Sequence, residues 1–257
     1  MSSRERRDVT TPRRQPATGR RRRRTGAGTE LSREAYVDGA LNLIEKRGAD
    51  VVSARTLATA VGADPSALYR YFSGVDEVLR AVADRMIGIA LDAWTPGTDW
   101  LESLGDLARS LYRVYVLEFP RAGVAVASRT TGLPNEIRAV EITIGLLRDG
   151  GFDDATAAIW FRSLSDFLLG QAMLDGSFTG LPPEVRAADH AAWQDLPDRV
   201  TQASGSHAEA AAPHLRRLML ESSFEHTMAL MLAGLATMPR SADAAADGAV
   251  DPGDTAN

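Results

Sequence analysis

The sequence predicts an all-α protein in which a small helix-turn-helix domain is joined by a long helix to a second helical domain. Apolar residues recur at three- and four-residue intervals along most of the chain, and no segment shows the convincing alternation of a β-strand. The 257 residues suffice for two domains. The expected divisions are a disordered Arg-rich arm at 1–30, the helix-turn-helix domain at 31–78, the second domain at 79–238 and a disordered Ala/Asp-rich tail at 239–257.

The first two helices are marked by their caps and by their apolar faces. Ser32 can cap the first helix, and Gly48 stands where a left-handed terminator belongs. Its inward residues are Val37, Ala40, Leu41 and Ile44. Ser53 caps a second helix, whose inward residues are Ala54, Leu57, Ala58 and Val61. Each helix therefore has one face to bury.

A tight turn at Gly62 leads into a short third helix. Asp64 can cap this helix, and Pro65 suits its first position. Proline has no backbone N–H, and at the first position of a helix that group has no partner within the helix. The helix is barely two turns long, so it cannot stand alone in water. It depends on the neighbouring helices, with Leu68 and Phe72 as anchors.

A long fourth helix is expected to start after Ser73-Gly74 and to connect the two domains. The second domain then consists of further helices separated by glycine and proline. The expected helical ranges are 75–93, 101–117, 121–129, 133–150, 153–175 and 213–236. Residues 181–212, with two prolines near their start, are expected to form a long mobile connection.

Charge is unevenly distributed along the chain. Residues 1–30 carry a net charge of +7, and since the whole chain carries −5, residues 31–257 carry −12. The arm contains five successive arginines, Arg20, Arg21, Arg22, Arg23 and Arg24. A basic arm on an acidic body indicates contact with a polyanion such as DNA, either by entry into the minor groove or as a non-specific tail.

The helix-turn-helix indicates DNA binding, because its second helix enters the major groove in known complexes. The residues that carry it are Ser53-Ala54-Arg55-Thr56-Leu57-Ala58 and Val61-Gly62-Ala63-Asp64-Pro65-Ser66-Ala67-Leu68-Tyr69-Arg70-Tyr71-Phe72. This series resembles the DNA-binding domain of the tetracycline-repressor (TetR) family of bacterial regulators. The resemblance implies transcriptional control.

The candidate DNA-binding residues of this domain have different expected roles. Arginine can hold guanine O6 and N7 with two hydrogen bonds, and the resemblance places Arg55 where the tetracycline repressor reads a base; a solvated surface arginine is the alternative. Pro65, Ser66 and Ala67 are expected to face base edges. The remaining candidates are Ser53, Arg70, which can touch phosphate or base, and the phosphate-contacting positions Tyr69 and Tyr71. Tyr69 can also be partly buried against the first helix.

The start of the fourth helix departs from the family pattern. Family members often have a lysine where this chain has Val75, which is followed by Asp76 and Glu77. A phosphate contact is therefore lost, and two negative charges lie close to the DNA-binding helices. The arginine arm is expected to compensate for this loss.

The second domain resembles the ligand-binding domain of the tetracycline repressor over Asp99 to Ala236. The segments that carry this resemblance are 119–124, 150–155 and 224–230. It implies a homodimer in which the helix after Gly151 and the last helix pack against their copies, and two-fold symmetry would supply a second recognition helix. The expected interface residues are Leu164, Leu168, Phe224, Met228, Met231 and Leu235; an ordinary intramolecular core is the alternative.

The aromatic and polar residues of the second domain suggest a pocket for a small organic effector of unknown identity. The candidates are Tyr112, Tyr115, Arg129, Trp160, Ser163, Phe167 and Gln171, each of which can instead be a core residue. In the alignment, Ala127 replaces the histidine through which the tetracycline repressor binds a magnesium-drug chelate, and Asp175 replaces a metal-associated glutamate. We therefore expect no metal or cofactor and no tetracycline-magnesium ligand.

Other classes of protein fit the sequence less well. The chain has no cysteine, and its four histidines lie in the late connection and the last helix, so an enzyme is not expected. No apolar run approaches the length of a membrane span. We expect a cytoplasmic, nucleoid-associated repressor that a ligand releases from a palindromic DNA operator. The alternative is a DNA-binding or architectural protein whose second domain serves only dimerisation.

Overall fold

The computed structural model describes residues 31–204 and 221–240, together with 210–211, 213–215 and 218. The regular structure within these ranges is helical throughout, as the sequence predicts. The Arg-rich arm, with Arg20 to Arg24, and the tail after residue 240 lie outside the described residues. No described helix combines the length and the apolar character that crossing a membrane requires.

The N-terminal domain contains the expected helices α1 (Arg33–Arg47), α2 (Ala54–Ala60), η2 (Pro65–Arg70) and the first part of α3 (Val75–Ala93). The predicted caps are present: Ser32 Oγ accepts a hydrogen bond from Ala35 N, and Ser53 forms a reciprocal capping box with Thr56. Gly48 ends α1 with a positive φ of 85°, a conformation that favours glycine. The third helix, η2, is a 3₁₀ helix, and its predicted anchors Leu68 and Phe72 are buried.

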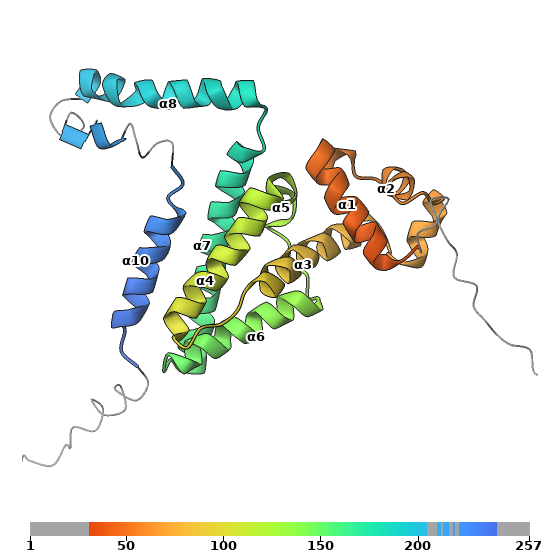
Figure 1. The fold of residues 1–257 in the computed structure, drawn as a ribbon, viewed down its shortest axis with the longest axis horizontal. Helices are drawn as coiled ribbons and strands as arrows, with labels where there is room; N and C mark the ends of the chain where they lie inside the picture. Colours follow the sequence, from red (N-terminus) through yellow and green to blue (C-terminus); the bar gives the residue numbers. More distant parts are fainter. Residues whose placement is uncertain (1–30, 205–209, 212, 216–217, 219–220, 241–257) are drawn as a thin grey trace, which may run out of the picture.

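The second domain is built from longer helices. They are α4 (Trp100–Tyr112), the π-helical turn η3 (Arg113–Glu118), α5 (Pro120–Val126), α6 (Pro134–Asp149), α7 (Asp154–Thr179), α8 (Pro183–Ser204) and α10 (Phe224–Thr237). In Figure 1, α3, α4, α6 and α7 form the body, α8 projects from the end of α7, and α10 returns along the opposite side of α7 from α3. Gly123 lets α5 lie against η3, because a Cβ there would meet the carbonyl oxygen of Tyr115 at 2.2 Å.

Two of the expected boundaries are wrong. Residues 183–204 form α8 rather than a mobile connection, because Pro183 occupies the first helical position, where proline begins a helix instead of breaking one. The last helix begins at Phe224 and not at Pro213, since residues 221–223 are not helical.

The hydrophobic core is continuous between the two domains. One cluster of buried residues runs from α1 and η2 along α3 to η3 and α5, and includes Ile44, Leu68, Met86 and Val114. Two smaller clusters join α7 to α10, one with contributions from α4 and α6 and the other flanked by α4 residues. The DNA-binding elements are therefore packed on the same core that supports the second domain.

Candidate functional site

The predicted DNA-reading residues lie mostly at the surface of α2 and η2. Arg55 is exposed in the first turn of α2, and Pro65, Ser66 and Arg70 are exposed on η2. The ring of Tyr69 is 63% exposed, an unusual exposure for a large aromatic side chain. These five side chains are available to a duplex, with arginine and hydroxyl groups suited to bases and phosphates.

The structure contradicts the predicted role of Ala67 and gives Ser53, Ser66 and Tyr71 hydrogen bonds within the chain. Ala67 is 8% exposed, so its methyl group packs inward with Leu68 and does not face base edges. The Tyr71 hydroxyl donates to the carbonyl oxygen of Leu31 at 2.7 Å. The Ser53 hydroxyl belongs to the α2 cap, and the Ser66 hydroxyl donates to the Asp64 carboxylate at 2.6 Å. DNA contacts from Ser53, Ser66 and Tyr71 would therefore compete with, or add to, these internal bonds.

The two acids at the start of α3 are neutralised by arginines. Glu77 accepts hydrogen bonds from Ser73 N at 2.7 Å and from Arg33 at 2.9 Å, and these bonds lower its pKa to about 2. Asp76 pairs with Arg129 at 2.6 Å and with Arg80 at 2.7 Å, and the bond from Arg129 lowers its pKa. Both acids stay ionised, but each charge is compensated locally, which weakens their repulsion of phosphates.

Arg129 therefore lies at the junction of the domains and not at an effector pocket. A second junction contact joins α5 to the end of α1: the Arg121 guanidinium reaches the carbonyl oxygens of Glu45 and Lys46, and the Glu45 carboxylate accepts from Ala122 N at 3.2 Å. The sequence analysis did not identify these polar residues, since nothing in their local pattern distinguishes them from solvated surface charges.

A further polar contact, made by Asp84, joins α3 to α6 within the second domain. The Asp84 carboxylate is on α3, 7% exposed, and it accepts hydrogen bonds from Asn135 N, Glu136 N and Asn135 Nδ2 at 2.9–3.0 Å. Asp84 thereby caps the N-terminus of α6, the charge-stabilised arrangement expected there. Its one sequence signal is an acid surrounded by the apolar residues Ala81, Val82 and Ala83, which the sequence analysis missed.

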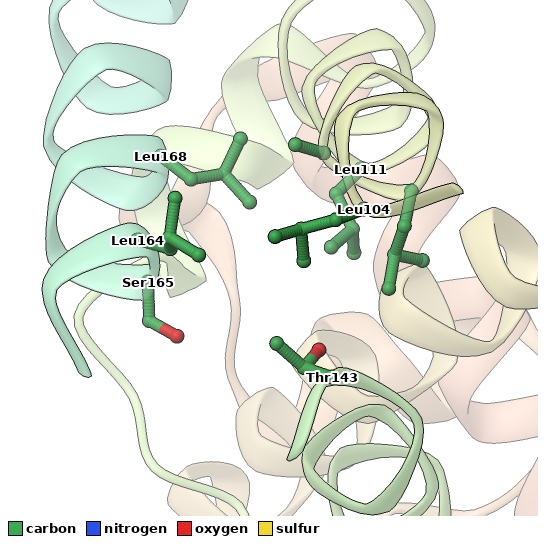
Figure 2. Close-up of a pocket in the computed structure, with 8 residues that line it drawn as sticks. Leu104, Leu111, Thr143, Leu164, Ser165 and Leu168 are labelled. Carbon is green, nitrogen blue, oxygen red and sulfur yellow. The ribbon is translucent and has the colours of Figure 1, made fainter. Parts of the chain in front are cut away.

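A small apolar cavity lies inside the second domain. Figure 2 shows it between Leu104 and Leu111 of α4, Leu164 and Leu168 of α7, and Thr143 of α6. The Thr143 and Ser165 hydroxyls donate to carbonyl oxygens of their own helices at 2.8 Å. The cavity volume of about 40 Å³ is far below the several hundred Å³ of typical ligand pockets.

Three of the predicted effector residues meet beside this cavity. Tyr112 of α4 and Phe167 of α7 both stack on Phe224 of α10. The Tyr112 hydroxyl and the Gln171 amide donate to the same oxygen of Asp175, at 2.6 and 2.9 Å. Burial, followed by the bond to Asp175, raises the pKa of Tyr112 to about 12, so its hydroxyl remains a donor at neutral pH.

The other predicted effector residues are dispersed. Tyr115 is buried in the interdomain core, where desolvation raises its pKa. Trp160 packs in the cluster around Leu104 and Leu147, and the Ser163 hydroxyl donates to the carbonyl of Ile159. Only Tyr112, Phe167 and Gln171 thus form one cluster.

The predicted dimer residues are largely core residues of the single chain. Leu164, Leu168, Phe224, Met228 and Leu235 are all less than 9% exposed, and Met231 packs partly buried against Leu235 and its neighbours. These five side chains are already buried within one chain, which leaves a second copy little of them to cover. The assignment of Met231, which is only partly buried, stays a prediction. The alternative of an intramolecular core holds for the five buried positions, because α7 and α10 turn these faces toward each other and toward α4.

The structure leaves single large apolar side chains of the same two helices exposed. On α7, Ile159 is 64% and Leu174 is 68% exposed, and on α10, Leu230 is 73% exposed. Monomeric proteins scatter single apolar residues over their surface, but a helix that is apolar on two sides needs two partners.

No metal centre is recognisable among the described residues. They contain no group of three or more His, Cys, Asp or Glu side chains placed to hold an ion. Ala127, at the position of the metal-binding histidine of the tetracycline repressor, is buried in the interdomain core.

Comparison with known proteins agrees with this arrangement. Residues 37–82 match the model of the bacterial regulatory proteins of the tetR family, and residues 95–239 match the tetracyclin repressor-like C-terminal domain. The tetracycline repressor protein class C of Escherichia coli is 26% identical over 213 residues, which cover 81% of this chain and 92% of that protein. A helix-turn-helix transcriptional regulator of Saccharopolyspora erythraea is 26% identical over 140 residues, 54% of this chain and 59% of that protein.

Solved structures show the same fold. ActR of Streptomyces coelicolor in complex with actinorhodin is 26% identical, with a TM-score of 0.62 over 80% of this chain and 95% of that one. BioQ bound to its double-stranded DNA operator is 19% identical, with a TM-score of 0.57 over 81% of this chain and all of the other, a likeness of fold alone. With the second family model covering more than half of the residues, the chain belongs to the tetR family of bacterial regulatory proteins, which are DNA-binding transcription factors and not enzymes.

Proposed function

We propose that this regulator is a repressor that binds a palindromic operator as a homodimer and leaves it when a small organic molecule binds the second domain. The observation that carries the proposal is the continuous core along α3, which packs η2 at one end and η3 and α5 at the other. A change of helix packing in the second domain therefore has a direct route to the recognition helix.

The exposed apolar side chains of α7 and α10 support the homodimer. Ile159 and Leu174 on α7 and Leu230 on α10 are the apolar side chains that a second copy would cover. An isologous interface pairs each patch with its own copy, which gives the two-fold symmetry that a palindrome requires.

The effector site is proposed between α4, α6, α7 and α10, where the cavity of Figure 2 adjoins the Tyr112–Phe167–Gln171 cluster. ActR, a relative, was solved with actinorhodin bound, which supports an organic effector for this chain as well. The small cavity favours the alternative, a regulator without an effector whose second domain only dimerises. The two hypotheses differ in one measurable property. If an effector lowers the affinity of the protein for its operator by some factor, then the operator must lower the affinity for the effector by that same factor.

Arg55 supplies the test of operator reading. Arg55→Ala should cost about 1–3 kcal/mol on the cognate operator and flatten discrimination at one base pair, as loss of a bidentate guanine contact does. The matched control is Arg148→Ala, which removes another exposed arginine, this one from α6, and should leave binding unchanged. Equal losses on the operator and on scrambled DNA would reduce Arg55 to a backbone contact.

A further inference from the structure

A phenyl ring from the start of α10 occupies the most aromatic position of the second domain. The centroid of the Phe224 ring lies 4.0 Å from that of the Tyr112 ring, with an angle of 15° between the ring planes. It lies 5.9 Å from the centroid of the Phe167 ring, with an interplanar angle of 7°. The ring is thus nearly parallel to both neighbours, and its residue is 2% exposed. Offset stacking with near-parallel planes is one of the two arrangements that aromatic rings prefer.

A hydroxyl from the same segment occupies the polar end of this position. Ser222 Oγ donates to Asp175 Oδ2 at 2.6 Å and accepts from Phe224 N at 3.1 Å. The same carboxylate oxygen receives the Tyr112 hydroxyl and the Gln171 amide. The carboxylate is therefore held by the Gln171 amide of α7, by Ser222 of the segment leading into α10, and by the Tyr112 hydroxyl of α4, whose single proton is shared with Ser222 Oγ at 2.9 Å.

The cavity adjoins the ring. Ala108, Leu111 and Leu168 line the cavity and also pack in the cluster that contains Phe224. The cavity alone, at about 40 Å³, holds no organic molecule. Loss of a buried large side chain opens about 150 Å³, which is enough to bind benzene.

We infer that Ser222 and Phe224 occupy the effector site and that a planar phenol displaces them. The inference rests on the proposed function and names the ligand class of that site. The aromatic system of the phenol stacks on Tyr112 and Phe167, extends into the cavity, and its hydroxyl replaces Ser222 as donor to Asp175.

Displacement of Phe224 by a ligand would change the position of α10. Ser222 precedes α10 and Phe224 is its first residue, while Leu230 of the proposed dimer interface is exposed further along the same helix. A ligand that expels Phe224 removes the anchor at the N-terminal end of α10, so α10 shifts at the interface and changes the spacing of the two recognition helices. Ligand affinity is lowered by the energy needed to expel the ring, which makes wild-type affinity weaker than that of a chain without the ring.

The test removes the Phe224 ring, with which the ligand would compete for the site, and uses 2-naphthol as the probe. Phe224→Ala should bind 2-naphthol at least tenfold more tightly than the wild-type chain, as measured by calorimetry on the full-length protein. The matched control is Leu235→Ala, which removes an equally buried residue of α10 from a cluster without a carboxylate. Affinity in Phe224→Ala no greater than in Leu235→Ala would overturn the inference.

Two further variants address the hydroxyl and the fold. In Phe224→Ala, 2-naphthol should bind at least fivefold more tightly than naphthalene, and Asp175→Asn should remove most of this preference; equal binding of the two probes would refute the carboxylate role. Ser222→Ala alters an exposed residue, so folding is preserved, and it should raise wild-type affinity for 2-naphthol by two- to fivefold. No increase in Ser222→Ala would count against displacement even if Phe224→Ala failed to fold.

Operator binding by the same proteins separates this inference from the proposed function. Tight 2-naphthol binding by Phe224→Ala without loss of operator affinity would leave the phenol site in place and refute release by this ligand class. A different molecule that releases the wild-type chain, with no gain of phenol binding in Phe224→Ala, would refute the inference and leave the proposed function standing.

Discussion

Replacing Asp84 should both destabilise the chain and loosen the packing of α6 on α3. In Asp84→Ala, Asn135 N and Glu136 N lose their shared acceptor, and Asn135 Nδ2 loses its partner. Loss of an N-cap costs about 0.5–2 kcal/mol. A buried donor left unsatisfied costs about 1–3 kcal/mol. Because the three bonds share one carboxylate, these costs overlap, and we expect a total of about 3–5 kcal/mol.

The conservative variant Asp84→Asn should cost less stability than Asp84→Ala. Asp84→Asn keeps one oxygen for the two backbone N–H groups but turns an amide toward the Asn135 amide, so one donor faces another. We expect a cost of about 1–3 kcal/mol. Adding Asn135→Asp restores a donor-acceptor pair in the opposite sense, and the double variant should recover at least half of the loss.

Urea unfolding at one fixed protein concentration measures these differences, since the stability of a dimer depends on concentration. The control is Asp92→Ala, which removes an exposed acid of α3 that pairs with Arg138 on α6 and should cost far less than Asp84→Ala. A change below about 1 kcal/mol for Asp84→Ala, or an additive double variant, would show that the capping bonds contribute nothing specific to the α3–α6 junction.

Four other expectations test separate parts of the molecule. The depressed pKa of Glu77 means that its stabilisation is complete above its ordinary pKa of 4.5 and is lost as pH falls toward 2, so the stability difference between wild type and Glu77→Gln should vanish across that range in acid unfolding. The raised pKa of Tyr112 means that its contribution is complete below pH 10 and is lost as pH rises toward 12, so Tyr112→Phe should flatten the alkaline loss of stability. Leu230→Arg should yield folded monomers in sedimentation, since the side chain is already exposed in the single chain. Deleting residues 1–24 should reduce the salt slope of operator binding by several units at about 0.9 per phosphate, and an unchanged slope would show that the arm does not touch DNA.

The N-terminal domain could be predicted closely because its signals are local. Ser32 and Ser53 cap helices, Gly48 ends one, and Pro65 begins another, and each of these effects acts within a few residues. The error at Ala67 arose because the 3₁₀ geometry of η2 has a different period from an α-helix, which changes the residues that face inward.

The faces of α7 and α10 could not be predicted for a different reason. Apolar spacing identifies residues that are buried, but it does not say whether the partner is the same chain or a second copy. Leu164 and Phe224 were assigned to the second copy and are buried within one chain, while Ile159 and Leu230 received no such role and are the exposed ones. The sequence of one chain cannot separate these cases, because both interiors exclude water equally.

Three kinds of contact hold the DNA-binding domain on the second domain, and their expected strengths differ. The Asp76–Arg129 pair lies at the surface, where solvent and salt screen ion pairs and their net contribution is small. The contacts of Arg121 with Glu45 and Lys46 are long, at 3.3–3.4 Å, and exposed. The shared core along α3 is screened by neither, so it sets the orientation of the recognition helix. A signal from the effector site must therefore act on α3 through η3, α5 and α6, and salt should weaken operator binding through the DNA contacts while leaving the coupling between ligand and DNA nearly unchanged.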